Sequence, residues 1–167
     1  MYLQILYRYG CRFTSDSEII KDCIQDLFTV LYKNRKTLVV PDNVKVYLMV
    51  SLKNNLIRAL YKENFYNRND TEGIEFSLEP TVEDVFIDNE QVTNQQKEIQ
   101  KIFALLTSRQ KEVLYYRYIQ ELEIDKICLL MNMNYQSVEN LIQRSLKKIR
   151  TSYGYEAGLL FLLLPSP

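Results

Sequence analysis

The sequence predicts an all-α protein, in which two small helical domains are joined by an acidic flexible linker and the C-terminal domain contains a helix-turn-helix. Apolar residues recur at three- and four-residue spacing in both halves of the chain, and this rhythm fades between residues 67 and 95. Near the end, Asn132-Met133-Asn134 separates two helical rhythms. The 167 residues are enough for two small domains with buried cores. The expected segments are a first helical domain, a linker, a second helical domain and an apolar tail, at residues 1–66, 67–95, 96–153 and 154–167.

The composition excludes several kinds of catalytic and metal site. The chain has no histidine, so a His-based general base and a Ser-His or Cys-His nucleophile are excluded. Its three cysteines, at 11, 23 and 128, are not closely paired, which excludes a structural zinc site and fits small core residues in a reducing compartment. We therefore expect a protein that is not an enzyme, with no catalytic residues, no metal and no cofactor.

Charge and hydropathy limit the partners. Lys plus Arg and Asp plus Glu both number 21, so any DNA binding must rest on local positive charge. No signal peptide is visible at the start, and the tail GLLFLLLPSP has six consecutive apolar residues, against the roughly twenty that cross a bilayer. A cytoplasmic protein without membrane insertion is expected.

Three helices are predicted in the first domain. Gly10 weakens the first helix without necessarily ending it, and a capping box from Ser15 to Glu18 opens the second. The loop KNRKTLVVPDN follows, and Asp42 after Pro41 is expected to start the third helix. The first apolar stripe is Tyr2, Ile5, Leu6, Tyr9 and Phe13, the second is Ile20, Ile24, Leu27, Phe28 and Leu31, and the third is Val44, Tyr47, Leu48, Leu52, Leu56 and Ala59.

The linker is predicted from its acidic composition, which cannot bury much surface. Its acids are Asp70, Glu72, Glu75, Glu79, Glu83, Asp84, Asp88 and Glu90. Helical spacing returns in the second domain, where Thr107 to Gln110 forms another capping box. The apolar residues before and after this box are Ile99, Ile102, Phe103, Leu106, Val113, Leu114, Tyr118 and Ile119.

The segment from Ile124 to Arg150 has the pattern of a helix-turn-helix. Asn132 suits the left-handed end of the first helix, and Asn134 can cap the second. The second helix has an apolar stripe of Val138, Leu141, Ile142, Leu146 and Ile149, and an opposite face of Gln136, Glu139, Asn140, Gln143, Arg144 and Lys147. In a major groove, Gln and Asn read adenine and Arg reads guanine. An ordinary helical hairpin with a solvated, Lys-rich last turn remains the alternative.

Three segments carry a family resemblance. LLTSRQKEVLYYRYIQELEIDKICLLMNMNYQSVENLIQRSLKKIR resembles the promoter-reading fourth region of bacterial sigma factors of the extracytoplasmic function (ECF) group, in the sigma-70 family. DSEIIKDCIQDLFTVLYKNR resembles the second-region helix that docks on the polymerase clamp, and KVYLMVSLKNNLIRALYKEN resembles the helix that opens and reads the minus-ten element. The resemblance implies a sigma factor whose partners are core RNA polymerase, promoter DNA and an anti-sigma factor. It also implies another stretch of helix before the first one, so Met1 is expected to be an internal or truncated beginning.

The resemblance also implies three sets of site residues. The minus-thirty-five element would be read by Tyr135, Gln136, Ser137, Glu139, Asn140, Gln143, Arg144 and Lys147. The minus-ten element would be read by Asn43, Lys53, Asn54 and Arg58, and the last three of these are expected on one side of the third helix. Tyr61 is expected as a stacking surface, while Tyr47 is expected in the core, with stacking as its alternative. Polymerase would be bound by Asp22, Gln25, Asp26 and Thr29. Glu139 departs from a position that is often basic, and an acid there can accept from cytosine.

Two other readings stay open from the sequence. A stand-alone helix-turn-helix regulator would bind two half-sites as a symmetric dimer and would need no polymerase. A helical interaction protein would bind no DNA at all. The clamp-like and minus-ten-like segments favour the sigma factor over both.

Overall fold

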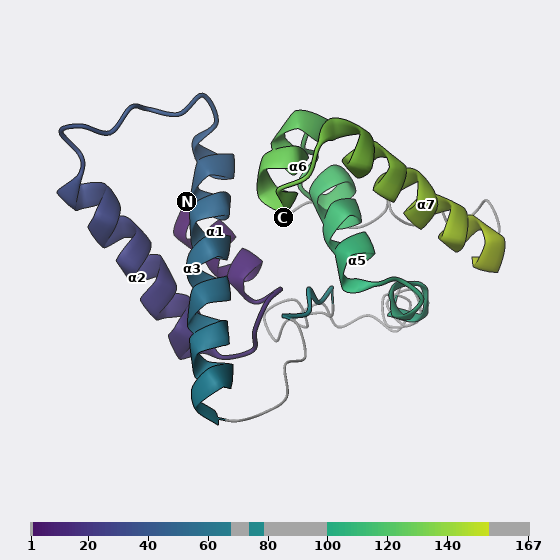
Figure 1. Cartoon of the computed structure of the whole chain (residues 1–167), viewed down its shortest axis with the longest axis horizontal. Helices are drawn as coiled ribbons and strands as arrows, with labels where there is room; N and C mark the ends of the chain where they lie inside the picture. Colours follow the sequence, from purple (N-terminus) through teal and green to yellow (C-terminus); the bar gives the residue numbers. More distant parts are fainter. Residues whose placement is uncertain (1, 68–73, 79–99, 154–167) are drawn as a thin grey trace, which may run out of the picture. The chain divides into compact units, whose positions relative to one another are not determined.

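The computed structural model describes residues 2–67, 74–78 and 100–153, which fall into two compact units, Met1–Glu75 and Phe76–Pro167 (Figure 1). Within those ranges all regular secondary structure is helical, and no strand is present. The predicted all-α class is therefore confirmed. Each unit is considered by itself below.

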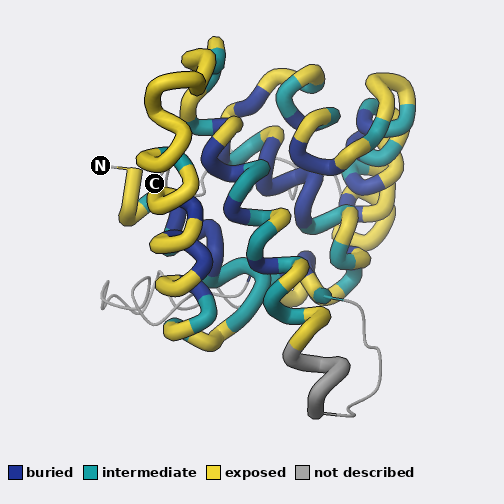
Figure 2. The backbone as a smooth tube through the Cα atoms, turned by 60° about the vertical axis from the view of Figure 1, so that its left-hand side comes forward, coloured by how far each residue is buried: buried dark blue, intermediate teal, exposed yellow. Residues whose placement is uncertain are grey.

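Unit 1 is a packed set of three helices, α1 (Tyr2–Gly10), α2 (Ser17–Lys33) and α3 (Val44–Asn67), each of which contacts the other two. In the view of Figure 1, α2 rises and α3 descends, and the loop of residues 34–43 joins their upper ends. Buried positions recur along the helices as dark blue bands (Figure 2). The buried apolar side chains of this unit are Leu6, Tyr9, Ile20, Cys23, Ile24, Leu27, Val46, Leu48, Met49, Leu52 and Leu56.

The first helix ends at Gly10, which is buried against α2. A Cβ atom at this position would lie 2.7 Å from Cγ2 of Ile20, so the close approach of the two helices depends on the missing side chain. Phe13, which the sequence places on the same stripe, lies beyond the helix and packs edge-on against Tyr9, with 5.2 Å between ring centroids.

Replacing Gly10 by alanine is expected to destabilise unit 1. Alanine is the better helix former by roughly 0.5–1 kcal/mol, so a net loss of stability would isolate the steric effect. Overpacking of this kind costs about 1–3 kcal/mol, measured by urea unfolding. In an Ile20→Ala background, which removes the crowded γ-carbons, the same substitution should cost less. Equal costs in both backgrounds would contradict the close contact.

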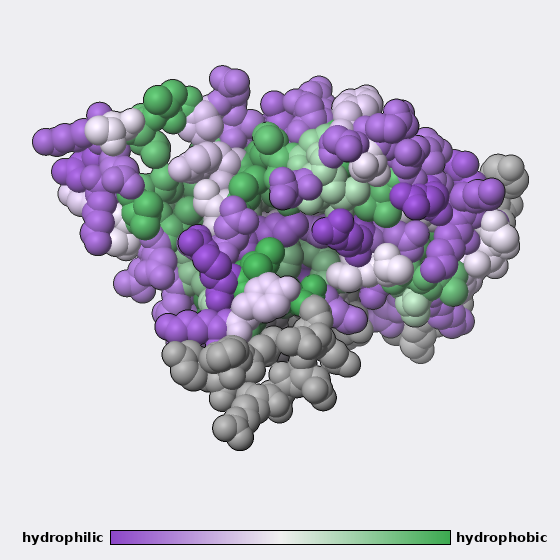
Figure 3. All heavy atoms as spheres, viewed as in Figure 1, coloured by the Kyte–Doolittle hydropathy of each residue, from purple (hydrophilic) through white to green (hydrophobic). Residues whose placement is uncertain are grey.

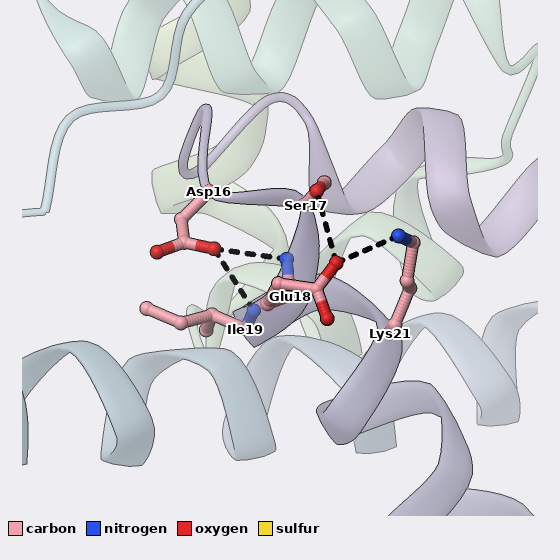
Figure 4. A network of polar contacts seen from close by, with 5 residues as sticks. All are labelled: Asp16, Ser17, Glu18, Ile19 and Lys21. Carbon is pink, nitrogen blue, oxygen red and sulfur yellow. Dashed lines mark hydrogen bonds and ion pairs between the residues drawn. The ribbon is translucent and has the colours of Figure 1, made fainter.

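The start of α2 differs from the predicted capping box. The N-cap is Asp16, whose carboxylate accepts hydrogen bonds from the backbone N–H groups of Glu18 (2.9 Å) and Ile19 (3.2 Å) (Figure 4). The predicted box from Ser15 to Glu18 is wrong, because the helix begins at Ser17 and Glu18 is then one position too early to reach back. Glu18 pairs instead with Lys21 at 2.8 Å, and this hydrogen bond lowers the pKa of the Glu18 carboxyl.

The third helix begins at Val44, and its cap is Asn43 rather than Asp42. The Asn43 side-chain oxygen accepts from Val46 N at 3.0 Å. Val46 and Met49 are buried in the core of unit 1, whereas Val44 and Tyr47, which the sequence predicts as core, are each 37 % exposed. Phe28 is likewise exposed at the surface of α2.

Unit 2 contains a helical segment at residues 100–104, followed by α5 (Ser108–Leu114), η2 (Tyr115–Ile119), α6 (Ile124–Met131) and α7 (Tyr135–Tyr153). Helix α5 contacts α7 and η2, and α6 contacts the same two elements. The predicted capping box is confirmed: Thr107 Oγ1 accepts from Gln110 N, and Gln110 Oε1 accepts from Thr107 N.

The helix that follows this box changes to a π-helical turn, η2. The backbone N–H of Gln120 donates to the carbonyl oxygen of Tyr115 at 2.9 Å, five residues back. The wider turn places both Tyr115 and Tyr116 inside, so the predicted core positions Tyr118 and Ile119 are only half-buried. This part of the predicted stripe is therefore wrong.

A short described segment, residues 74–78, lies within the predicted linker. Phe76 and Leu78 are buried, and both belong to unit 2. The segment thus packs on folded structure at these two positions, where the sequence predicts flexible chain. Apart from Glu75, the acidic residues of the predicted linker lie outside the described residues, and so does the predicted tail at 154–167.

Candidate nucleic-acid and protein interfaces

The turn between α6 and α7 has the geometry that its two asparagines predict. Asn132 is left-handed, with φ 50° and ψ 52°, and its N–H donates to the carbonyl oxygen of Cys128. Asn134 Oδ1 accepts from Ser137 N at 2.8 Å, which caps α7. The two helices and their tight turn therefore form a helix-turn-helix.

One side of α7 is buried in unit 2, and the other side is open. The buried residues are Val138, Ile142, Ser145 and Ile149, while Leu141 and Leu146 are half-buried. Sequence reasoning missed Ser145, which is tolerated in the core because its hydroxyl donates to the Leu141 carbonyl oxygen at 2.6 Å. Of the predicted reading residues, Ser137 and Glu139 are half-buried, and the exposed ones are Tyr135, Gln136, Asn140, Gln143, Arg144 and Lys147.

Hydrogen bonds order the polar side chains on the open face of α7. Gln136 Nε2 donates to Asn140 Oδ1 at 3.2 Å, and Arg144 Nε donates to the Asn140 carbonyl oxygen at 3.3 Å. In the described part of the chain no carboxylate pairs with Arg144 or Lys147, so their charges are available to a ligand. Amides beside unpaired cations are the groups that bind base edges and phosphates.

The four predicted polymerase-binding residues form one stripe on α2. Asp22, Gln25, Asp26 and Thr29 are all exposed and follow the spacing of one helix face. The buried Cys23 lies next to them in the sequence. Burial raises the pKa of its thiol, and the charges of Asp26 and Asp22 raise it further. The Cys23 thiol thus stays protonated, and the charged groups that this stripe exposes are the carboxylates of Asp22 and Asp26.

An apolar surface adjoins the C-terminal end of α2. In Figure 3, green side chains gather at the upper left, over the loop between α2 and α3. The exposed apolar residues here are Val30 and Tyr32 on α2 and Leu38, Val39 and Val40 in the loop. Apolar surface beside charged residues is typical of protein-binding sites.

The predicted minus-ten residues do not share one face of α3. Asn54 and Arg58 are exposed on the same side as Tyr47 and Tyr61, at spacings of three, four and seven residues. Lys53 lies on another side, half-buried, with Nζ 6.0 Å from the Phe13 ring centroid. The expectation that Lys53 and Asn54 lie together is wrong, because adjacent residues in a helix are about 100° apart.

Two asparagines have structural roles at this face. The side-chain oxygen of Asn43 is engaged as the α3 cap. Asn55, which sequence reasoning missed, accepts from Arg58 Nη2 at 2.8 Å and donates to the Cys23 carbonyl oxygen at 3.5 Å. With Arg58 Nε also donating to the Asn54 carbonyl oxygen, the guanidinium is held along the helix surface.

Comparisons with known proteins identify the second unit and the fold. Residues 96–149 match the family model for Sigma-70, region 4. The solved structure of the sigma factor RpoE in complex with the anti-sigma factor NepR from Bartonella quintana is similar to this chain, with a TM-score of 0.61 and 12% sequence identity over 90% of each chain. At this identity the likeness concerns the fold. No curated protein sequence matches the chain.

The helix-turn-helix and the family match define unit 2 as a sigma region 4 domain, a module of bacterial transcription factors. Over the whole chain, the likeness to the RpoE structure shows a shared helical fold. Among the described residues, no helix combines the length and the apolar character needed to span a bilayer.

Proposed function

We propose that this chain is a sigma factor of the ECF group in the sigma-70 family, which joins core RNA polymerase in the cytoplasm and directs it to promoters. It would read the minus-thirty-five element with α7 and the minus-ten element with the exposed side of α3. The observation that carries the proposal is the open face of α7, where amides and unpaired cations follow a helix-turn-helix inside the region 4 match. Polymerase supplies the chemistry of transcription, and the chain supplies promoter choice.

Polymerase and an anti-sigma factor are the proposed protein partners. The acidic stripe of α2 and the apolar surface at its C-terminal end together suit a basic, partly apolar surface on polymerase. The similar RpoE structure is a complex with an anti-sigma factor, which supports an anti-sigma partner for this chain as well.

The hydrogen bond between Gln136 and Asn140 suggests how α7 reads a base. Because Asn140 Oδ1 is already engaged, the pair presents the Asn140 amide hydrogens as donors and Gln136 Oε1 as an acceptor. Adenine offers the complementary acceptor and donor in the major groove. We therefore assign an adenine of the minus-thirty-five element to this pair, with Gln143 and Arg144 reading the neighbouring bases.

The exposed side of α3 suits bases that have left the duplex stack. Tyr47 and Tyr61 offer ring faces for stacking, while Asn54 and Arg58 between them offer hydrogen-bond donors. This set replaces the earlier expectation for Lys53, which faces Phe13. Asn43 is assigned to positioning the start of α3 rather than to base contact.

Gln143→Ala and Lys147→Ala are expected to have different effects on promoter selection. A good base contact discriminates by about 1–3 kcal/mol, so Gln143→Ala should relax the preference at one position of the minus-thirty-five element. Lys147→Ala should weaken binding to all DNA sequences alike. It should also reduce the slope of the logarithm of the binding constant against the logarithm of the salt concentration by about 0.9. Selection of bound sequences by holoenzyme, followed by salt titration, measures both. If both variants keep the same preferred site, affinity and salt slope, α7 is not the reading helix.

A further inference from the structure

Arg109 lies in the first turn of α5, where its neighbours form the structural contacts. Thr107 and Gln110 cap the start of this helix, and Ser108 Oγ accepts a hydrogen bond from the Phe76 backbone N–H at 2.6 Å. Arg109 itself is exposed, and no acidic residue lies in the same turn. A cation at this end of a helix is unfavourable because it opposes the helix dipole. The stability of α5 therefore does not account for Arg109.

The Arg109 side chain extends to the turn of the helix-turn-helix. Its Nη1 donates to Met133 Sδ at 3.8 Å, although the two residues are 24 positions apart in the sequence. Met133 lies between Asn132, which is left-handed, and Asn134, which caps α7. Helix α5 thus places a cation directly beside the turn from which α7 begins.

The charge of Arg109 is available to a ligand. A guanidinium has five N–H donors, and the thioether of Met133 is only a weak acceptor. Among the described residues no carboxylate pairs with Arg109. Arg117, another exposed arginine of unit 2, differs, because its Nη1 donates to the Leu122 carbonyl oxygen at 3.0 Å and supports the chain before α6. Arg109 thus combines a defined position with donors that an anion can use.

This position is next to the residues proposed to read DNA. Gln136 follows Met133 by three residues, so their Cα atoms are at most about 11 Å apart. In a helix-turn-helix, the N-terminal residues of the second helix contact base edges in the major groove. A guanidinium beside the turn therefore meets the phosphate backbone that borders this groove, and it can bind a phosphate through two parallel hydrogen bonds.

We propose that Arg109 binds a backbone phosphate of the minus-thirty-five element beside the N-terminus of α7 and positions this helix in the groove. The inference rests on the proposed function, in which α7 reads that element. Phosphate contacts fix the register of a protein on the duplex and carry no sequence information themselves. Because α5 packs against α7, a phosphate held by Arg109 sets the register with which Gln136 and Asn140 meet their base. The DNA-binding surface of unit 2 thus includes α5.

The test removes the Arg109 charge from the full chain, assembled with core polymerase on a promoter that the wild-type holoenzyme selects. Arg109→Met keeps an unbranched side chain beside Met133. It should reduce the slope of the logarithm of the binding constant against the logarithm of the salt concentration by about 0.9, as expected for one phosphate. Its loss of affinity should accordingly be ~3.5-fold larger at about 50 mM salt than at about 200 mM. Arg109→Lys keeps the charge and should retain the wild-type slope.

Lys111→Met is the matched control. It removes one positive charge from the same helix, two residues further on and about 200° around the helix axis from Arg109, and should leave the salt slope unchanged. Ethylation interference adds a positional measurement. Ethylation of one phosphate at the edge of the minus-thirty-five element should weaken binding by the wild type and by the control, and should have no effect on Arg109→Met. A wild-type slope and interference pattern for Arg109→Met would overturn the assignment.

Thermal unfolding separates a phosphate contact from a structural role. Arg109→Met removes a cation from the unfavourable end of α5, so its melting temperature should not fall. A lower melting temperature together with weaker binding would overturn the assignment. Gln143→Ala separates the inference from the proposed function. If Gln143→Ala changes the preferred sequence while Arg109→Met leaves the salt slope unchanged, the inference alone fails, and if neither variant changes binding, the proposed function fails with it.

Discussion

Replacing both Asp22 and Asp26 by lysine is expected to abolish promoter-specific transcription while leaving the fold intact. Both carboxylates are exposed on α2, four residues apart, and no base pairs with them in the described part of the chain. Against a basic polymerase surface, two reversed charges would turn attraction into repulsion worth several kcal/mol, which is enough to prevent assembly. Run-off transcription and co-purification with core polymerase measure the loss, and circular dichroism measures the fold.

The matched control reverses two exposed acids elsewhere in unit 1, Asp42 and Glu75. This variant has the same change in net charge and should keep most of its activity. Equal loss in both variants would assign the effect to overall charge. Normal transcription by the Asp22/Asp26 variant would remove α2 from the docking surface.

The isolated chain is expected to bind promoter DNA weakly and to become a specific binder when core polymerase is added. Its net charge is +0, so little non-specific affinity comes from phosphate neutralisation. Polymerase that fixes both units makes the second DNA contact intramolecular, which raises the apparent affinity by roughly 10²–10⁴-fold. Fluorescence anisotropy of a labelled promoter with the chain, with polymerase and with both measures this gain.

This measurement also separates the sigma factor from the stand-alone regulator. A regulator would bind its site tightly without polymerase and would do so as a symmetric dimer. Tight, sequence-specific binding by the isolated chain, with no change on addition of polymerase, would therefore contradict the proposed function.

Short-range features of the fold were predictable from the sequence. The Thr107 capping box, the left-handed Asn132 and the Asn134 cap each depend on a few neighbouring residues, and all three are confirmed. The open face of α7 was predictable for the same reason, because a clear apolar stripe determines which side is left over.

Features that depend on packing were not predictable. Apolar residues occur on several sides of α3, so its sequence alone could not distinguish Val46 and Met49 from Val44 and Tyr47 as core residues. The caps lie one residue later than predicted, at Asp16 and Asn43, because neighbouring residues in both segments are of types that can cap a helix. Phe76 lies among acidic residues and is buried only because a site on unit 2 receives it.

The π-helical turn η2 makes the register of unit 2 sensitive to the deletion of a single residue. Such a turn holds about one residue more than an α-helical turn, as a single inserted codon would produce. Deleting one residue from Tyr115–Ile119 would restore an α-helix and rotate α5 by about 100° relative to the chain that follows. Tyr115 and Tyr116 could then no longer both face inward. We therefore expect that a relative with one residue fewer in the segment Tyr115–Ile119 lacks the inward-facing aromatic pair. Such a relative would also lack the site that Phe76 occupies here.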